Sequence, residues 1–311
     1  MPHSRAKPGR FGAVVTAMVT PFDERGRLDL DGAVELARHL GSSGSEGLVL
    51  AGTTGEAPVL SDAEKIELWG TIAAAESGLA VIAGAGTNDT RRSIELVEAA
   101  TEQGVDAILA VTPYYSRPSQ AGLEAHFRAV AAATHLPVML YDIPVRTGRR
   151  ISAEVIVRLA NEVENIIALK DAAGDLAGTS KLAAELPARF EIYSGDDILT
   201  LPFLSVGAVG VVSVASHWAG REQFEMISAY FAGEVELART LNAALLPSYA
   251  FETGDEAPNP IPAKAMLRVM GLPAGQCRLP LGEAPSGLEE RAKQLLADLD
   301  AWRDFWHGPQ G

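Results

Sequence analysis

The sequence contains almost no cysteine and no recognisable metal-binding pattern. Its 311 residues include a single cysteine, Cys277, and six histidines. One thiol cannot form an internal disulfide, and the histidines show neither an H-E-x-x-H motif nor another ligand spacing. We therefore expect no metal site, and a reducing, cytoplasmic setting suits the chain best.

Positive charge is also scarce. The chain has 26 Lys and Arg residues against 40 Asp and Glu residues, which gives a formal net charge of -14. A surface this acidic repels phosphate backbones, so we expect no binding to nucleic acid. It also repels an anionic substrate at long range, so any carboxylate site needs local positive charge.

Long apolar runs are missing. No stretch approaches the roughly 20 apolar residues that a membrane-spanning helix needs. The start of the chain, MPHSRAKPGRFG, is basic and polar and has no apolar stretch before a cleavage site, so we expect no secretory signal. Hydrophobic residues nevertheless make up 47% of the chain, which is enough for a large core. The composition is that of a globular protein without a membrane partner.

What the sequence does contain is a regular alternation of two patterns. Segments with helical spacing alternate with short apolar, β-branched runs, which are typical of strands buried on both faces. These runs recur about every 25–30 residues, at 12–19, 47–50, 80–83, 107–111, 137–141, 166–169, 190–193 and 210–214. Ser61 and Glu64 form a capping box for one of the helices, and Asp89 or Thr90 can cap the next.

Eight such strands predict an α/β fold, a (β/α)8 TIM barrel with a C-terminal helical appendage. An open doubly wound sheet is the weaker alternative, because the fingerprint G-x-G-x-x-G is missing after the first strand. Beyond about residue 215, helices are expected at 218–251, 259–270 and 286–305. We divide the chain into a loose arm (1–9), the barrel (10–233) and a C-terminal helical domain (234–311).

In such a barrel the reactive groups lie where the strands end. Lys170 directly follows the sixth predicted strand, so its side chain is expected at the mouth of an apolar barrel. Burial there disfavours the charged ammonium form and frees the amine to attack a carbonyl. The alternative is a structural lysine paired with Asp171 or with another carboxylate.

Two further strand ends carry groups suited to a carboxylate substrate. The segment GTTGE at 52–56 offers hydroxyls and amides between glycines, although an ordinary glycine turn has the same composition. Tyr141 ends the fifth predicted strand, where its phenol could move protons beside the lysine. Arg146 offers a fork that fits a carboxylate. A packed tyrosine and a surface arginine are the alternatives.

The ends of the fourth and seventh strands are more ambiguous. Tyr114 and Tyr115 suit a binding site, a subunit contact or simple packing between loops. Asp196 and Asp197 could hold a divalent ion, but capping of a helix that begins near Ile198 is the simpler interpretation.

Several motifs occur in a fixed order along the chain. They are TAMVTPF (16–22), GTTGE (52–56), AGAGTNDT (83–90), VTPYYSRP (111–118), LYDIPVRTG (140–148), LKDAAGD (169–175), SGDD (194–197) and NPIPAK (259–264). With these motifs the sequence resembles the dihydrodipicolinate synthase / N-acetylneuraminate lyase superfamily, from about Gly12 to Leu279. It is most similar to the synthases of the actinobacterial kind.

The resemblance implies an activity and an assembly. The activity is a Schiff-base aldol condensation of pyruvate with L-aspartate 4-semialdehyde, which feeds lysine and diaminopimelate biosynthesis. No metal or organic cofactor is needed, because the lysine supplies the electrophilic catalysis. Members of the family are typically homotetramers built as a dimer of tight dimers.

The resemblance also implies a role for individual residues. Lys170 forms the imine, and a proton relay consists of Tyr141, Thr53 and Tyr115, the last reaching in from a neighbouring subunit. Thr53 and Thr54 lie at the pyruvate carboxylate, with Thr54 its main side-chain ligand. The remaining substrate-binding residues are Gly195 and Val212, which line the pocket, and Arg146, which anchors the carboxylate of the semialdehyde.

Two of these residues favour the synthase over its relatives. Sialic acid lyases usually carry serine where this chain has Thr53, and they lack the arginine found here as Arg146. Two alternatives remain: another pyruvate-dependent aldolase that acts on a sugar acid or keto acid, and a non-catalytic keto-acid-binding paralogue.

One departure concerns regulation. Lysine-inhibited synthases bind lysine between subunits through two histidines and a glutamate, near positions that match Asn88 and Tyr114. Here the histidine positions correspond to Asp62 and Lys65, and the glutamate position corresponds to Arg92. Because an arginine repels the ammonium groups of the inhibitor, we expect weak or absent inhibition by lysine.

Overall fold

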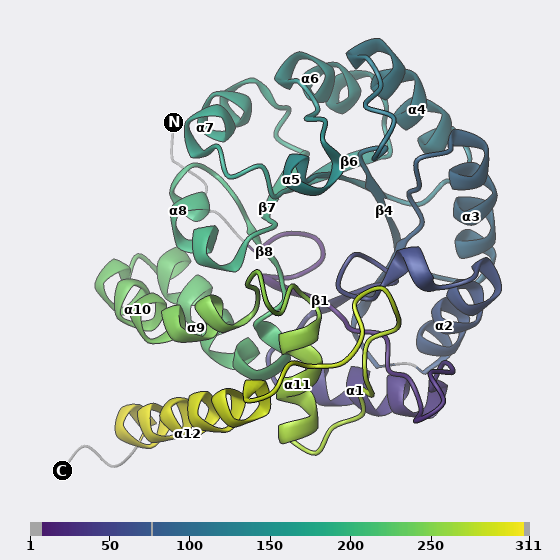
Figure 1. Cartoon of the computed structure of the whole chain (residues 1–311). Coiled ribbons are helices and arrows are strands. Elements are labelled where there is room, and N and C mark those ends of the chain that lie inside the picture. Colours follow the sequence, from purple (N-terminus) through teal and green to yellow (C-terminus); the bar gives the residue numbers. More distant parts are fainter. Residues whose placement is uncertain (1–7, 76, 308–311) are drawn as a thin grey trace.

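The computed structural model describes residues 8–75 and 77–307, and its centre is a closed parallel barrel. Eight strands within the described residues pair in sequence order, and β8 returns to pair with β1 (Figure 1). The predicted TIM barrel is therefore confirmed. The strands are β1 Val14–Ala17, β2 Gly47–Leu50, β3 Ala80–Gly84, β4 Ala107–Val111, β5 Val138–Asp142, β6 Ile166–Asp171, β7 Glu191–Ser194 and β8 Gly210–Ser213.

Both faces of the barrel wall are buried, which explains why the strand sequences are apolar throughout. One set of side chains fills the barrel interior, including Val15, Met139, Ala168 and Tyr193. The intervening residues pack outward against the surrounding helices, as Leu140 and Leu169 do. Because side chains alternate along a strand, this division fixes which residues can reach the interior.

Helices surround the barrel and account for the segments with helical spacing (Figure 1). Ser61 and Glu64 form the predicted capping box of α2, and Asp89 caps α3 through the amides of Arg91 and Arg92. The helices up to β8 are α1 Leu30–Ser42, η1 Ala57–Val59, α2 Asp62–Ala74, α3 Thr90–Glu102, α4 Gln120–Ala132, α5 Pro144–Thr147, α6 Ala153–Glu162, α7 Leu176–Glu185, η2 Asp197–Leu199 and α8 Thr200–Ser205.

The predicted single helix over residues 218–251 is wrong. Two helices occupy this region, α9 Ser216–Ala232 and α10 Val235–Phe251, and they pack against each other. Gly233 separates them in a left-handed conformation with φ 85°, where a residue with a side chain would be strained. The glycine ends α9 as a C-terminal cap, so the chain reverses direction.

The remaining helices gather on one side of the barrel (Figure 1). They are α11 Ile261–Val269 and α12 Leu288–His307, close to the expected ranges, and they pack against each other. Residues 1–7 of the predicted arm lie outside the described residues. Within the described part of the chain, no helix is both long and apolar enough to cross a membrane.

Candidate active site

Lys170 and Tyr141 lie side by side inside the barrel. They are register partners on β6 and β5, and both strands continue for one residue beyond them, to Asp171 and Asp142. Alternation places each two residues after a side chain of the barrel interior, Ala168 or Met139. The Lys170 Nζ lies 4.4 Å from the centroid of the Tyr141 ring, and both side chains are buried. An amine is thus held against a phenol at the end of an apolar barrel.

Lys170 does not form the ion pair considered as its alternative role. The carboxylate of Asp171 accepts hydrogen bonds from the Ala173 amide and the Thr179 hydroxyl, on the outer side of the barrel wall. Among the described residues, no carboxylate oxygen lies within 4.0 Å of the Lys170 amine. The amine is therefore buried without a salt bridge, which is the state that a nucleophilic lysine requires.

Two further predicted residues border the lysine. A β-carbon added to Gly195 would lie 3.0 Å from the Cγ of Lys170 and 2.8 Å from the Cβ of Ala172, so only glycine fits there. Val212 on β8 belongs to the barrel interior and is 1% exposed. Both residues restrict the space around the lysine stem.

The loop after β2 places a hydroxyl pair at the barrel mouth. Thr53 is half-buried, whereas Thr54 is buried. The side-chain amide of Asn259 donates a hydrogen bond of 3.0 Å to the Thr54 Oγ1. Because this oxygen accepts from Asn259, the Thr54 hydroxyl proton is free to donate to an anion.

The same loop is fastened to the C-terminal helices by a buried ion pair. Glu56, with a left-handed φ of 58°, lies 2.6 Å from the Lys264 Nζ on α11, and both side chains are almost fully buried. The other oxygen of Glu56 accepts from the Arg278 amide at 2.8 Å. Desolvation lowers the pKa of Lys264, and the Glu56 charge opposes that shift. The ion pair holds the loop in a conformation that glutamate alone disfavours.

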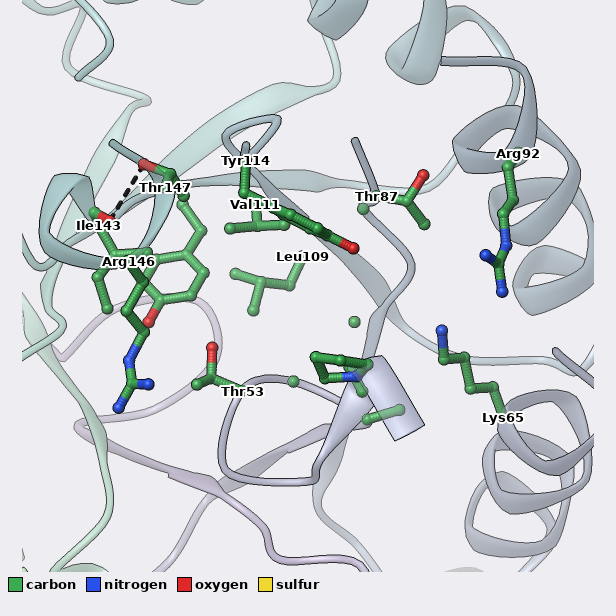
Figure 2. A pocket seen from close by; sticks show the side chains of 17 residues that line it. Thr53, Lys65, Thr87, Arg92, Leu109, Val111, Tyr114, Ile143, Arg146 and Thr147 are labelled. Atoms are coloured by element: carbon green, nitrogen blue, oxygen red, sulfur yellow. Dashed lines mark hydrogen bonds between the residues drawn. The ribbon is translucent and has the colours of Figure 1, made fainter. Parts of the chain in front are cut away.

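A cavity of about 320 Å³ opens above these strand ends. Figure 2 shows Thr53 and Arg146 on one side of it, Tyr114 across the top, and Lys65 and Arg92 on the opposite side. Tyr141 belongs to the lining, so its ring connects the cavity to the Lys170 amine. Arg146 is exposed on α5, and among the described residues it has no carboxylate partner within 4.0 Å.

Tyr115 is the one predicted catalytic residue that this chain does not bring to the site. Its side chain is 92% exposed, and its backbone adopts a left-handed φ of 72°. Tyr114 lines the cavity, whereas Tyr115 does not. A single chain therefore leaves a large aromatic side chain in solvent.

The predicted capping role of Asp197 is wrong, whereas Asp196 occupies the N-cap position of η2. Asp196 precedes η2 but forms no capping hydrogen bond through its side chain. The Asp197 carboxylate is buried and accepts from the Ser213 hydroxyl and, at 2.8 Å, from the Val214 amide. It joins the end of β7 to the end of β8. In residues 8–75 and 77–307, no three His, Cys, Asp or Glu side chains are grouped so as to hold a metal ion.

Sequence reasoning missed the residues that support the loop after β2. Asn259 and Lys264 both belong to the segment NPIPAK, which we quoted only as a motif. They are far in sequence from the residues that they support. Asn259 and Thr54, for example, are 205 residues apart. Their presence in one short motif was the only available signal.

Comparisons with known proteins agree with this geometry. The model of the dihydrodipicolinate synthetase family matches residues 10–299. A 4-hydroxy-tetrahydrodipicolinate synthase from Acidothermus cellulolyticus is 50% identical over 298 residues, covering 95% of this chain and 94% of the relative.

Two solved structures are also similar. Dihydrodipicolinate synthase from Cyanidioschyzon merolae with lysine bound has a TM-score of 0.91 and 42% identity, covering 94% of this chain and 99% of its own. The chloride-inhibited dihydrodipicolinate synthase from Acinetobacter baumannii, complexed with pyruvate, has a TM-score of 0.88 and 36% identity, covering 93% and 99%. The chain belongs to the dihydrodipicolinate synthetase family.

Proposed function

We propose that this protein is a 4-hydroxy-tetrahydrodipicolinate synthase, a class I aldolase-type lyase that condenses pyruvate with L-aspartate 4-semialdehyde. The activity is that of the relatives, which are about half identical over nearly the whole chain. The observation that carries the mechanism is the Lys170 amine, buried 4.4 Å from the Tyr141 ring and without a carboxylate partner among the described residues.

The reaction begins at the Lys170 amine. The amine adds to the ketone carbon of pyruvate, and loss of water leaves a protonated imine. The imine withdraws electrons, so a methyl proton departs and an enamine forms. The enamine carbon attacks the aldehyde of the second substrate, whose oxygen takes up a proton. Hydrolysis of the imine returns the amine, and the product cyclises.

The residues around Lys170 transfer protons, bind the pyruvate carboxylate and shape the pocket. Tyr141 and Thr53 move protons during formation and hydrolysis of the imine. Thr54 donates to the pyruvate carboxylate, supported by its hydrogen bond from Asn259. Gly195 and Val212 shape the pocket around the lysine stem.

Arg146 selects the second substrate. Its guanidinium lines the cavity without a carboxylate partner in the described part of the chain, so its fork is available for the carboxylate of the semialdehyde. This favours a short acidic aldehyde over a sugar acid. Turnover of aspartate semialdehyde compared with that of sialic acid and 2-keto-3-deoxygluconate tests the assignment, and preference for either sugar acid would contradict it.

Tyr115 completes the relay from a neighbouring subunit. Its 92% exposure and strained backbone in the single chain support a contact made only on assembly. The assembly is a homotetramer, a dimer of tight dimers, in which each protomer of a dimer lends Tyr115 to the other. Light scattering of the purified protein measures this state directly.

Borohydride trapping tests the covalent step. Treatment with pyruvate and borohydride should add one reduced pyruvate to Lys170, located by peptide mass measurement. The same treatment should leave Lys170→Ala unmodified, whereas Lys181→Met, which removes an exposed lysine on α7, should be modified as wild type is. A non-catalytic keto-acid-binding paralogue would show no adduct on Lys170, and this result would overturn the proposal.

Feedback by lysine is weak or absent. Arg92 and Lys65 stand together at one end of the cavity, where they repel the ammonium groups of the amino acid (Figure 2). Activity should be unchanged by submillimolar lysine, and any inhibition should require higher concentrations. Inhibition at submillimolar lysine would contradict this.

A further inference from the structure

Two arginines connect the loop that carries Tyr115 with the end of the helix that carries Arg146. The Arg117 Nε donates to the Gly148 carbonyl at 2.9 Å, and a terminal nitrogen of Arg149 donates to the Arg117 carbonyl at 3.0 Å. The stem of Arg117 also lies against Gly148, since a β-carbon added to this glycine would lie 3.6 Å from the Arg117 Cγ and Cδ. We call Arg117 and Arg149 the arginine link.

The loop at one end of the arginine link has an unfavourable backbone. Tyr115 and Arg117 both adopt a left-handed φ, of 72° and 49°. Ser116 lies between them, and its amide donates to the Tyr114 carbonyl at 2.9 Å. Side chains disfavour the left-handed region, so such a turn persists only where its surroundings fix it. The arginine link supplies two of these contacts, at a residue only two positions after Tyr115.

The helix at the other end is fixed by its own hydrogen bonds. Gly148 caps α5 in a left-handed conformation, and its amide donates to the Pro144 carbonyl at 2.9 Å. The Thr147 hydroxyl donates to the Arg149 carbonyl at 2.8 Å. Arg146 and Thr147 both line the cavity. The last turn of α5 therefore holds the main chain of Arg149, and the Arg149 side chain reaches from there to the loop.

Arg149 is poorly suited to a purely stabilising role. In residues 8–75 and 77–307 it forms no ion pair with a carboxylate, whereas its neighbour Arg150 lies 2.7 Å from an oxygen of Asp175. The Arg149 Nε is buried and has no hydrogen-bond partner in the described part of the chain. A buried donor without an acceptor costs free energy. The contribution of this side chain thus lies in its hydrogen bond to the Arg117 carbonyl.

We propose that Arg149 is a positioning residue for the proposed reaction. Through the main chain of Arg117 it sets the direction of Tyr115, and it ties that loop to the turn that presents Arg146. The inference rests on the proposed function, in which Tyr115 moves protons and Arg146 holds the semialdehyde. Arg149 does not itself line the cavity. Its loss should affect the steps that use those two residues and leave pyruvate binding intact.

Steady-state kinetics with pyruvate and aspartate semialdehyde test this role. Arg149→Met keeps an apolar stem and removes the donors, so kcat/KM for the semialdehyde should fall about tenfold. The KM for pyruvate should stay within about twofold of wild type, because Thr54 is oriented by Asn259 instead. Arg149→Lys retains a donor and should recover part of the loss. The control is Arg158→Met, which removes an arginine that pairs with Glu124 away from the cavity, and it should behave as wild type.

The melting temperature separates positioning from folding. Arg149→Met removes one hydrogen bond and also the unsatisfied Nε, so it should melt within about 2 °C of wild type. Loss of activity in proportion to a lower melting temperature would overturn the proposal.

Salt separates the hydrogen bond from a long-range effect of charge. Arg149→Met also removes a positive charge, and attraction of an anionic substrate by that charge is screened at about 1 M salt, where the screening length is about 3 Å. The loss in kcat/KM should persist there. Wild-type kinetics of the variant at high salt would mean that Arg149 only attracts anions, and this would overturn the proposal.

The two proposals fail in different ways. If the wild-type protein does not turn over aspartate semialdehyde, the proposed function is refuted, and the role of Arg149 with it. If wild type is active and Arg149→Met is equally active, only the role of Arg149 is refuted.

Discussion

At the scale of single residues, the chemistry depends on which groups lack a partner and which are occupied. Lys170 is buried without a carboxylate among the described residues, and Arg146 is likewise free to take one. Thr54, in contrast, is already oriented by Asn259. In the proposed reaction Asn259 is a positioning residue, because its amide determines the direction in which the Thr54 hydroxyl can donate.

The first prediction concerns Asn259. Asn259→Ala should raise the KM for pyruvate about five- to tenfold with a smaller effect on kcat, because one hydrogen bond is worth about 1 kcal/mol. Asn259→Asp should be worse, since a carboxylate takes the Thr54 proton and repels the pyruvate carboxylate. Steady-state kinetics with pyruvate as the varied substrate measure both effects. A purely structural role would lower the melting temperature and leave the KM of both variants unchanged.

The second prediction uses Asp142, the buried carboxyl at the end of β5. Burial raises its pKa to about 7, although a hydrogen bond from the Ile151 amide opposes the shift. A raised pKa means that the folded protein binds the proton more tightly than the unfolded chain does. The stability that this provides is complete below pH 3.8, the ordinary pKa of an aspartate side chain, and is lost as the pH rises through about 7.

Asp142→Asn keeps an acceptor for the Ile151 amide and removes the titration. Relative to wild type, the variant should therefore gain stability between pH 5 and 8, on the order of 2 to 4 kcal/mol. Denaturant unfolding across this range measures the difference. Asp175→Asn is the control, because the pKa of Asp175 is lowered, chiefly by Arg150, and it titrates below the window. A parallel pH dependence of Asp142→Asn and wild type would refute the assignment.

At the scale of elements, the site depends on contacts between parts that are distant in sequence. The loop after β2 is held by α11 and by the segment before it, through Glu56–Lys264 and Thr54–Asn259. The C-terminal helices therefore position the hydroxyl pair at the barrel mouth. This is a structural reason for the NPIPAK segment to lie beside the GTTGE segment.

The third prediction tests this connection. Lys264→Met should destabilise the protein by about 3–5 kcal/mol, because it leaves Glu56 buried and unpaired. Glu56→Gln combined with Lys264→Met should recover part of that loss. Lys181→Met, on the exposed face of α7, should change stability by less than about 0.5 kcal/mol. Urea unfolding measures the free energy of unfolding of the four proteins. A Lys264→Met variant as stable as wild type would show that the ion pair is dispensable.

At the scale of the whole molecule, the proposed relay is incomplete in the single chain, because Tyr115 is exposed. The barrel brings Lys170, Tyr141 and Thr53 to one end, whereas Tyr115 stands in solvent. The proposed dimer removes this discrepancy by exchanging the tyrosine between protomers. Assembly and activity are then coupled.

The fourth prediction follows from that exchange. Tyr115→Phe and Lys170→Ala should each have little activity, but co-expressed protomers should regain about a quarter of the wild-type rate, because random pairing leaves one site in four intact. The coupled assay with pyruvate and aspartate semialdehyde measures this recovery. Co-expression of two differently tagged copies of Lys170→Ala is the control, and its activity is the baseline from which the recovery is measured. If the co-expressed protomers are no more active than the two variants added together, Tyr115 does not act in the site of the neighbouring subunit.

Much of the fold was available from the sequence, because a strand buried on both faces must be apolar along its whole length. This physical constraint located the eight strands and the barrel, with errors of one or two residues at their ends. It also placed Lys170 and Tyr141 at neighbouring strand ends. The pair was predictable because adjacent parallel strands bring their carboxyl ends together. The domain boundary was drawn at residue 233, but the helix expected over 218–251 ran across it, because Gly233 was not recognised as a C-terminal cap.

The tertiary structure alone determined which groups are paired. Sequence could not show that Asp62 is taken by Arg92 rather than by Lys65, that Asn259 bonds Thr54, or that Asp197 links two strands instead of capping a helix. These contacts depend on distances between side chains from separate elements. The local pattern of hydrophobic and polar residues along the sequence carries no information about those distances. The order of strands follows from hydrophobic burial along the chain, whereas the partners of buried polar groups follow only from packing in three dimensions.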